Sequence, residues 1–374
     1  MKYGINPEDK EQFEKYGYNI RNLSNEYSIK IGSETCALIG ISNLLWSNRR
    51  AELFLYLSKD LEFDVLKYII PVALDKYLSF ICDSGIENIV LNVSSKDAFM
   101  LYLLSNTKMN YIGMVPYYFE DQTGANASFL FEYYPQMKKK YNINVQSKLS
   151  SKEGSMKLGD LEDVIKEKLK VTILDDKENL VKDFAQTKAQ LPQFLYLEDV
   201  LFDDREIKAV SPQYLLGKNN NITDVVAGYI EALTNREKFS IPLGEDKYII
   251  QEGNGKYGVS KQVLNFDYIL LDKNNKFAGF CNRLSTEGRN ARIDIGIHPK
   301  YQRKGYGSKL LSCYYDELFR IGYLALTSYV FDFNEPSIKL HEKYSKLIGV
   351  RKNSYYANGK LWNMNIYVKE KWMK

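Results

Sequence analysis

One stretch, residues 293–311, constrains this chain more than any other: it reads IDIGIHPKYQRKGYGSKLL. Apolar residues alternate with polar or small ones up to Pro299, which predicts a strand that ends there. The loop 302–307 (QRKGYG) follows, and apolar residues then recur at helical spacing over 308–321, as far as Gly322. In such a strand–loop–helix unit, successive backbone N–H groups of the loop and the first helical turn point outward without partners in the helix. An anion can bind to these groups.

The composition of this loop favours a phosphate ligand. Gly305 and Gly307 let the backbone approach a ligand closely, and Arg303 and Lys304 add positive charge. The spacing differs from the two common nucleotide motifs, since a P-loop needs GxxxxGK and a dinucleotide fold needs GxGxxG, whereas this loop reads QxxGxG. We therefore predict a pyrophosphate site that belongs to neither of those folds.

In this setting the segment 267–368 resembles the GNAT superfamily of acyl-CoA N-acyltransferases, through the core IHPKYQRKGYGSKLL and the downstream stretch NEPSIKLHEKY. The resemblance implies acetyl-CoA as co-substrate and direct attack of a neutral amine on its thioester. It also implies that the loop amides bind the pyrophosphate and that the pantetheine arm pairs with a strand backbone. The implied cofactor-binding residues are Ile295, Gly296, Ile297, Gln302, Arg303, Lys304, Gly305, Tyr306, Gly307, Ser308 and Asn334.

Direct transfer requires a base for the amine, an oxyanion donor and an acid for the leaving thiolate. Asp294 lies on the polar side of the predicted strand and is our candidate base; the alternative is an ion pair with Arg292 or Lys300. His341 stands where many members of the resembled family have the tyrosine that protonates the thiolate, and Tyr344 follows one helical turn later. Both remain candidate acids, with core packing as the alternative for each.

The first half of the chain repeats the order of elements expected in the second half. The interval from Gly85 to Gly113 is 28 residues and that from Gly322 to Gly349 is 27, which is typical of a tandem duplication. We predict an α/β (α+β) fold of two GNAT-like domains, each a mixed, mostly antiparallel sheet flanked by helices. The expected domains are a degenerate copy at 1–140 and an acetyltransferase domain at 161–374, joined by a polar linker at 141–160.

The degenerate copy is expected to lack a phosphate site. Its matching loop, 59–64, reads KDLEFD, which has no glycine and carries several acids. Such a loop should repel a pyrophosphate.

Composition narrows the function further. The 374 residues carry a formal net charge of +4 without a block of basic residues, so we expect no nucleic-acid partner. Apolar runs are shorter than about 18 residues and the first residues lack an apolar signal core, so we expect a cytoplasmic protein with no membrane partner. Two histidines and four scattered cysteines give no set of metal ligands, so we expect no metal.

We therefore expect an N-acetyltransferase that acts on the primary amine of a small molecule, such as an amino sugar, an amino acid or a polyamine. A non-catalytic acyl-CoA-binding regulator or scaffold and a protein or peptide N-acetyltransferase are the alternatives. The sequence leaves a homodimer open.

Overall fold

A computed structural model of the chain describes residues 2–3, 5–20, 24–45, 49–121, 124–135, 141–175, 177, 179–183, 195–217, 222–234, 263–357 and 360–373. The chain forms two compact units. Unit 1 consists of Met1–Met114, Asn126–Thr187 and Arg351–Asn363, and unit 2 of Val115–Ala125, Lys188–Val350 and Met364–Lys374. Each unit therefore combines segments that lie far apart in the sequence.

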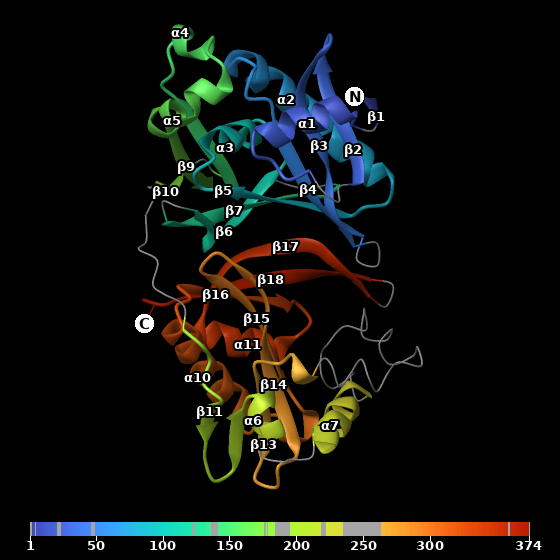
Figure 1. The fold of residues 1–374 in the computed structure, drawn as a ribbon, viewed down its shortest axis with the longest axis vertical. Helices are drawn as coiled ribbons and strands as arrows, with labels where there is room; N and C mark the ends of the chain where they lie inside the picture. The colour runs from blue at the N-terminus through green and yellow to red at the C-terminus, as the bar shows by residue number, and fades with distance from the viewer. Residues whose placement is uncertain are drawn as a thin grey trace. The chain divides into compact units, whose positions relative to one another are not determined.

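Unit 2 is built on an eight-stranded sheet with the order β11-β12-β13-β14-β15-β16-β18-β17 (Figure 1), although the tip of its last hairpin, 351–363, is counted in unit 1. The ladders from β11 to β15 and between β16 and β18 are antiparallel, while β15 and β16 are parallel. The strands are β11 (Val200–Asp203), β12 (Ile207–Val210), β13 (Tyr268–Asp272), β14 (Phe277–Glu287), β15 (Asn290–Ile297), β16 (Ala325–Phe331), β17 (Lys346–Ala357) and β18 (Lys360–Glu370).

Helices pack on both faces of this sheet. On one face α10 (Tyr306–Arg320) buries residues at helical spacing, among them Leu310, Tyr314 and Leu318, against Ile293 of β15. Helix α11 (Glu335–Tyr344) packs beside this core through Leu340. On the other face α7 (Ile222–Thr234) buries Tyr229 among aromatic residues of β14, and α6 (Pro212–Gly217) adds to the same core. The strand and helix predicted from 293–311 are confirmed.

Unit 1 contains a seven-stranded sheet, β1-β2-β3-β4-β5-β7-β6, and a three-stranded sheet, β10-β9-β8. The strands are β1 (Lys2–Tyr3), β2 (Ser24–Ile31), β3 (Glu34–Leu45), β4 (Arg50–Leu57), β5 (Asn88–Ser94), β6 (Asn110–Asp121), β7 (Gly124–Tyr133), β8 (Tyr141–Ser147), β9 (Leu169–Asp175) and β10 (Leu180–Asp183). The hairpin tip 115–125 is counted in unit 2.

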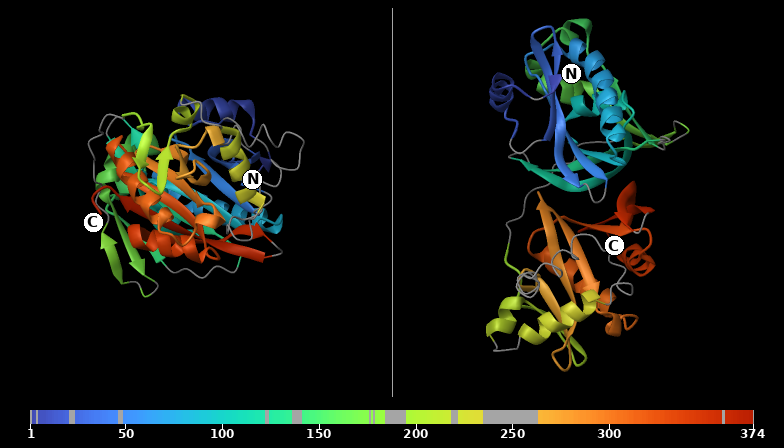
Figure 2. Two further views of the ribbon diagram at one scale, coloured as in Figure 1. Left: turned by 90° about the horizontal axis from the view of Figure 1, so that it is seen from below. Right: turned by 90° about the vertical axis from the view of Figure 1, so that its right-hand side faces the viewer.

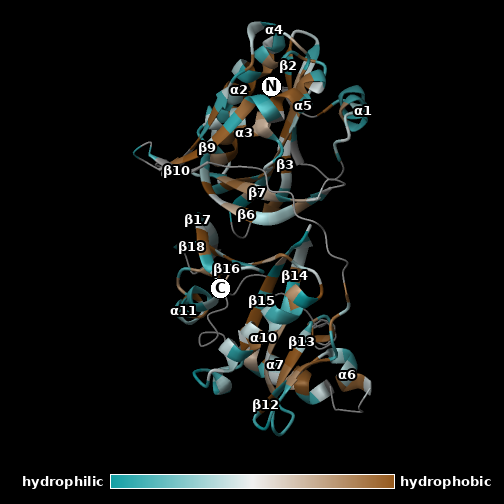
Figure 3. Cartoon of the chain, turned by 90° about the vertical axis from the view of Figure 1, so that its left-hand side faces the viewer, coloured by the Kyte–Doolittle hydropathy of each residue, from teal (hydrophilic) through white to brown (hydrophobic). Residues whose placement is uncertain are grey.

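The two faces of the large sheet of unit 1 carry different helices. Helix α2 (Phe63–Asp83) runs along one face (Figure 2) and forms the main core together with α3 (Ala98–Ser105). Helix α1 (Pro7–Lys15) is mostly hydrophilic (Figure 3) and covers Leu38 and Phe54 on the other face through its buried Phe13. Among the helices of the described ranges, none is long and apolar enough to cross a membrane.

The two large sheets share one topology. Strands β2-β3-β4-β5-β7-β6 and β13-β14-β15-β16-β18-β17 follow in the same order, each with one parallel pair, β4 with β5 and β15 with β16. These parallel ladders begin at Arg50↔Asn88 and at Asn290↔Ala325. Just before each ladder, the carbonyl of Arg49 or Arg289 accepts two backbone N–H groups from the start of the next strand. Residue 50 of β4 therefore corresponds to residue 290 of β15. The predicted fold class, mixed sheets flanked by helices, is confirmed.

The structure differs from the sequence expectation at 141–160. Instead of a linker, this segment contains β8, α4 (Ser151–Gly154) and the start of α5 (Leu158–Lys168), all in unit 1. The reason is local amphipathicity: Ile143 and Val145 of β8 and Leu158 of α5 are buried in the main core of unit 1, while the polar residues between them face outward. Further along the chain, α11 ends at Tyr344, because Ser345 is extended and β17 begins at Lys346.

Candidate active site

The loop between β15 and α10 has the backbone of an anion site. Arg303 and Gly305 both have positive φ, +60° and +81°, so the chain bends sharply before the helix. Gly305 is the N-cap and supplies no side chain, so no side-chain oxygen caps the first-turn amides of α10. Residues 303–305 are exposed, and the loop is therefore open to a ligand from solvent. Exposed amides, the helix dipole and two basic side chains favour a bound phosphate.

Side-chain hydrogen bonds and an ion pair hold residues 300–302, just before the turn, in place. The Tyr301 hydroxyl donates to Asp272 Oδ2 over 2.9 Å, and Gln302 Nε2 donates to the Ile297 carbonyl over 3.1 Å. Lys300 pairs with Glu231 of α7 over 2.5 Å. A hollow of about 440 Å³ opens beside the loop, lined by Asp204, Arg205, Glu206, Ile207, Lys304, Gly305, Tyr306 and Lys309. Within it, Lys309 pairs with Asp204 and lowers the pKa of that carboxyl to about 2.

Strand β15 has an open backbone edge that leads to this loop. Its parallel ladder with β16 ends at Arg292↔Thr327, although β15 continues to Ile297. The His298 N–H donates to Ala278 on the β14 side, so by alternation the amides of Ile295 and Ile297 face the β16 side. Beyond Arg292 no ladder pair with β16 is present within the described part of these strands. An extended ligand could add there as a further strand.

Asp294 lies at the start of this open edge. It is exposed, and its Oδ1 accepts the Ile295 N–H over 2.8 Å, which turns the carboxylate toward the side where the ladder has ended. Its face of β15 also carries Gly296, where any Cβ would lie 2.4 Å from Phe280 Cε1. A side chain at 296 would therefore force the Phe280 ring to move, and Gly296 itself is buried beneath that ring.

Helix α11 supplies the remaining predicted residues. Asn334 is its N-cap, and Asn334 Oδ1 accepts the Ser337 N–H over 3.2 Å. His341 is 2% exposed; its Nδ1 lies 2.9 Å from the Ser337 carbonyl, and its ring packs against Tyr367. Burial lowers the pKa of His341, so the ring is neutral at pH 7. Tyr344 is half-buried beside α10.

The second histidine, His298, caps a short helix. His298 is 2% exposed, and its Nδ1 accepts the Lys300 N–H over 3.2 Å as the cap of the short helix η3 (Pro299–Tyr301). Burial lowers its pKa. Strand alternation places His298 on the face of Asp294, but its burial under Phe277 and Tyr301 could not be predicted from that pattern.

The loop, the open strand edge and α11 lie in a segment that matches a known protein family. Residues 259–345 match the family described as Acetyltransferase (GNAT) family. The chain carries a GNAT acetyltransferase domain. The matched segment spans the loop, the open strand edge and α11, so this part of unit 2 is of the acyl-CoA-dependent N-acyltransferase type.

Solved structures similar to the chain include an N-acetyltransferase from Staphylococcus aureus Mu50, with 22% identity, 44% of this chain and 96% of that chain covered, and a TM-score of 0.34. Another is the microcin C7 self-immunity acetyltransferase MccE in complex with acetyl-CoA and AMP, with 17% identity, coverage of 45% and 93%, and a TM-score of 0.36. A third is a phosphinothricin acetyltransferase from Sinorhizobium meliloti in complex with AcCoA, with 20% identity, coverage of 28% and 59%, and a TM-score of 0.26. No curated protein matches the chain.

Loop 59–64 of unit 1 corresponds to loop 302–307 of unit 2, and other residues of unit 1 cover it. Residues 156–159 run antiparallel to it, with a bridge between Glu62 and Lys157. The Phe63 N–H, at the start of α2, donates to the Met156 carbonyl over 3.2 Å. Tyr16, just after α1, hydrogen-bonds Asp60. The positions that would receive a phosphate are therefore already used.

The strand edge of unit 1 is covered as well. The register places Phe54 at the position of Asp294 and Tyr56 at that of Gly296. Phe54 is 5% exposed beneath α1, and Tyr18 stacks on Tyr56 with ring centroids 4.6 Å apart. Unit 1 thus has no carboxylate at the position of the candidate base.

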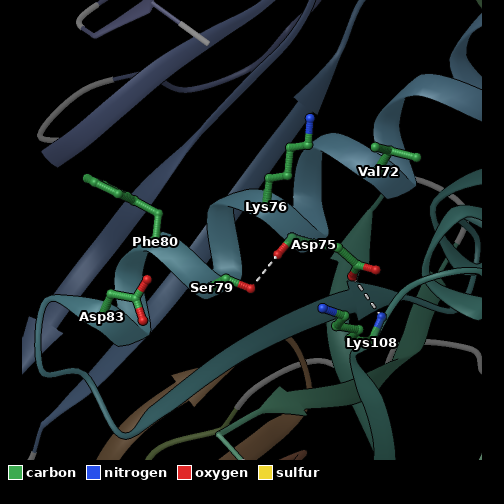
Figure 4. A pocket seen from close by; sticks show the side chains of 7 residues that line it. All are labelled: Val72, Asp75, Lys76, Ser79, Phe80, Asp83 and Lys108. Atoms are coloured by element: carbon green, nitrogen blue, oxygen red, sulfur yellow. Dashed lines mark hydrogen bonds between the residues drawn. The ribbon is translucent and has the colours of Figure 1, made fainter.

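Another hollow lies along α2 of unit 1 (Figure 4). Asp75 Oδ1 there accepts the Lys108 N–H over 2.8 Å, and the Ser79 hydroxyl donates to the Asp75 carbonyl. Its lining mixes acids, lysines and exposed apolar side chains, namely Val72, Asp75, Lys76, Ser79, Phe80, Asp83 and Lys108. None of the residues predicted for catalysis or cofactor binding lies in this hollow.

Proposed function

We propose that the chain is an N-acetyltransferase that transfers an acetyl group from acetyl-CoA to a primary amine of a small molecule. The observation that carries this proposal is the continuous path in unit 2 from the open amide loop, along the unpaired edge of β15, to the carboxylate of Asp294. Acetyl-CoA would supply an activated thioester to this path.

The chain's own residues suit each part of that ligand. The amides of 303–308 and the side chains of Arg303 and Lys304 would hold the pyrophosphate. The Ile295 carbonyl and the Ile297 N–H, which face the open edge, would pair with the pantetheine arm. The other two groups on that edge are already engaged, since Gln302 bonds the Ile297 carbonyl and Asp294 bonds the Ile295 N–H.

The roles in proton transfer follow from exposure and hydrogen bonding. Asp294 is exposed at the end of the path and would accept a proton from the ammonium form of the acceptor, directly or through water. Tyr344 would give a proton to the thiolate, because His341 is buried, neutral and already bonded through Nδ1 to Ser337. Asn334 Nδ2 would lie near the sulfur.

A matched pair of glycine variants tests the site. Gly305→Glu and Gly307→Glu place a carboxylate in the loop, and each should abolish CoA binding in calorimetry while the circular dichroism spectrum is unchanged. Gly217→Glu, at an exposed glycine with nothing within 4 Å, adds the same charge elsewhere and should bind CoA as the parent does. Unchanged CoA affinity in the loop variants would refute the pyrophosphate site, and CoA binding without CoA release from acetyl-CoA over an amine library would favour a regulator.

We also propose that the first half is a degenerate copy of the GNAT fold that binds no acyl-CoA. Its support is the shared strand order, the covered loop 59–63 and Phe54 in place of Asp294. Calorimetric titration of the full chain with CoA should give one site per chain, and Gly305→Glu should remove all binding. Residual binding in that variant would contradict the proposal.

A further inference from the structure

Two side chains on one face of β15 bear opposite charges. Arg292 and Asp294 are both exposed, and residues two apart on a strand point to the same face about 6.5–7 Å apart. Asp294 bonds the Ile295 N–H rather than Arg292, and no ion pair forms between them. The alternative role considered for Asp294, a salt bridge with Arg292, is therefore not the arrangement seen.

Arg292 is held by an aromatic ring instead. Its guanidinium carbon lies 4.5 Å from the centroid of the Tyr329 ring on β16. Stacking uses the flat face of a guanidinium and leaves its N–H edges in the plane, where they bind a carboxylate or phosphate in bidentate fashion. Within the residues that the structure describes, no carboxylate forms an ion pair with Arg292.

The Arg292–Tyr329 pair lies beside the open edge of β15. Arg292 and Thr327 form the last parallel pair, and Tyr329 is two residues beyond Thr327 on the same face of β16. The stacked pair therefore lies at the point where the two strands separate, next to Asp294. An acceptor whose amine meets Asp294 would have its neighbouring atoms beside the Arg292 guanidinium.

We infer that Arg292, stacked on Tyr329, selects an acceptor that carries an acidic group a few atoms from its amine, as an amino acid does. This inference rests on the proposed acetyltransferase function and narrows its substrate class. A polyamine would bring a second cation against Arg292, and an uncharged amino sugar would leave the guanidinium without an anion. A carboxylate and a phosphonate both satisfy the same geometry.

The test compares acceptors that differ only in the acidic group. The panel holds the twenty standard amino acids, their methyl esters, the matching aminoalkylphosphonates, spermidine and glucosamine, with CoA release as the readout. The best acid should exceed its own methyl ester by about 10- to 100-fold in kcat/KM, the usual range for a charged hydrogen bond. The phosphonates then show whether the preferred anion is a carboxylate or a phosphate-like group.

Variants connect that preference to Arg292. Arg292→Met should erase the acid-to-ester ratio, Arg292→Lys should restore part of it, and Lys273→Met, which removes a cation at the exposed β13–β14 turn, should preserve it. An acid and ester used equally well, a best rate with spermidine or glucosamine, or a ratio that survives in Arg292→Met would each overturn the inference while leaving acetylation intact.

A second readout separates the inference from the proposed function. Calorimetric binding of the same amines to the CoA-loaded protein should show the same preference in Kd without any turnover. Equal binding of acid and ester would overturn the inference. Failure of CoA itself to bind would instead refute the proposed function, and the inference with it.

Discussion

Glu132 of β7 offers a quantitative test of how unit 1 is held together. This carboxyl is 2% exposed, and its Oε2 accepts the Lys352 N–H over 3.1 Å and Asn88 Nδ2 over 3.3 Å. Burial raises its pKa from 4.5 to about 7, and these hydrogen bonds, with the nearby charge of Arg351, offset only part of the rise.

The sign of the effect on stability follows from proton binding. Between pH 4.5 and 7 the folded chain retains a proton on Glu132 that the unfolded chain releases, so this group lowers stability as pH rises through that window. The difference between the pKa of Glu132 in the folded and in the unfolded state corresponds to about 3 kcal/mol of unfolding free energy. This stability is fully lost once Glu132 is ionised in both states. Glu132→Gln keeps an oxygen for the Lys352 N–H and removes the charge.

The assay is urea unfolding of both proteins from pH 4.5 to pH 8, with amide exchange at Lys352 as a local readout. The unfolding free energy of Glu132→Gln, relative to the parent, should rise by about 3 kcal/mol across this range. Glu8→Gln changes an exposed carboxyl of α1 and serves as the control. Parallel stability curves for the parent and Glu132→Gln would refute the reasoning.

Three further predictions concern unit 2. Gly296→Ala places a Cβ 2.4 Å from Phe280 and should lower the unfolding free energy by about 1–3 kcal/mol, whereas Gly307→Ala, whose nearest contact is 3.4 Å, should melt near the parent temperature. Asp294→Asn should reduce kcat/KM by about 10²- to 10⁴-fold with CoA affinity unchanged in calorimetry, and equal rates would remove Asp294 as the base. Tyr344→Phe should lower kcat by about tenfold or more while His341→Phe lowers it less, and the reverse order in steady-state kinetics would move the acid to His341.

The loop and its two flanking elements could be predicted because their signals are local. The alternation that ends at Pro299, the glycines of QRKGYG and the helical spacing up to Gly322 all lie within one short stretch. The structure has β15 and α10 in the expected places, with Gly305 at positive φ as the N-cap. The family match at 259–345 covers the same stretch.

Features that depend on long-range contacts could not be predicted in this way. The sequence does not show that Tyr18 stacks on Tyr56, that residues 156–159 cover the loop after β4, or that His298 caps η3 beneath aromatic rings. The segment 141–160 was misjudged for a different reason. Its apolar residues are spaced for a strand and a helix, but frequent Lys and Ser lower its average hydropathy to that of a linker.

The make-up of unit 1 has a consequence for biosynthesis. Arg351–Asn363 belongs to that unit, and this segment includes Lys352, the partner of Glu132 and Asn88. A ribosome that adds about 5–20 residues per second has to finish most of unit 2 before that segment emerges. The first half of the nascent chain must therefore wait on the order of ten seconds or more, with Glu132 still lacking its backbone donor from Lys352, before its native contacts are complete.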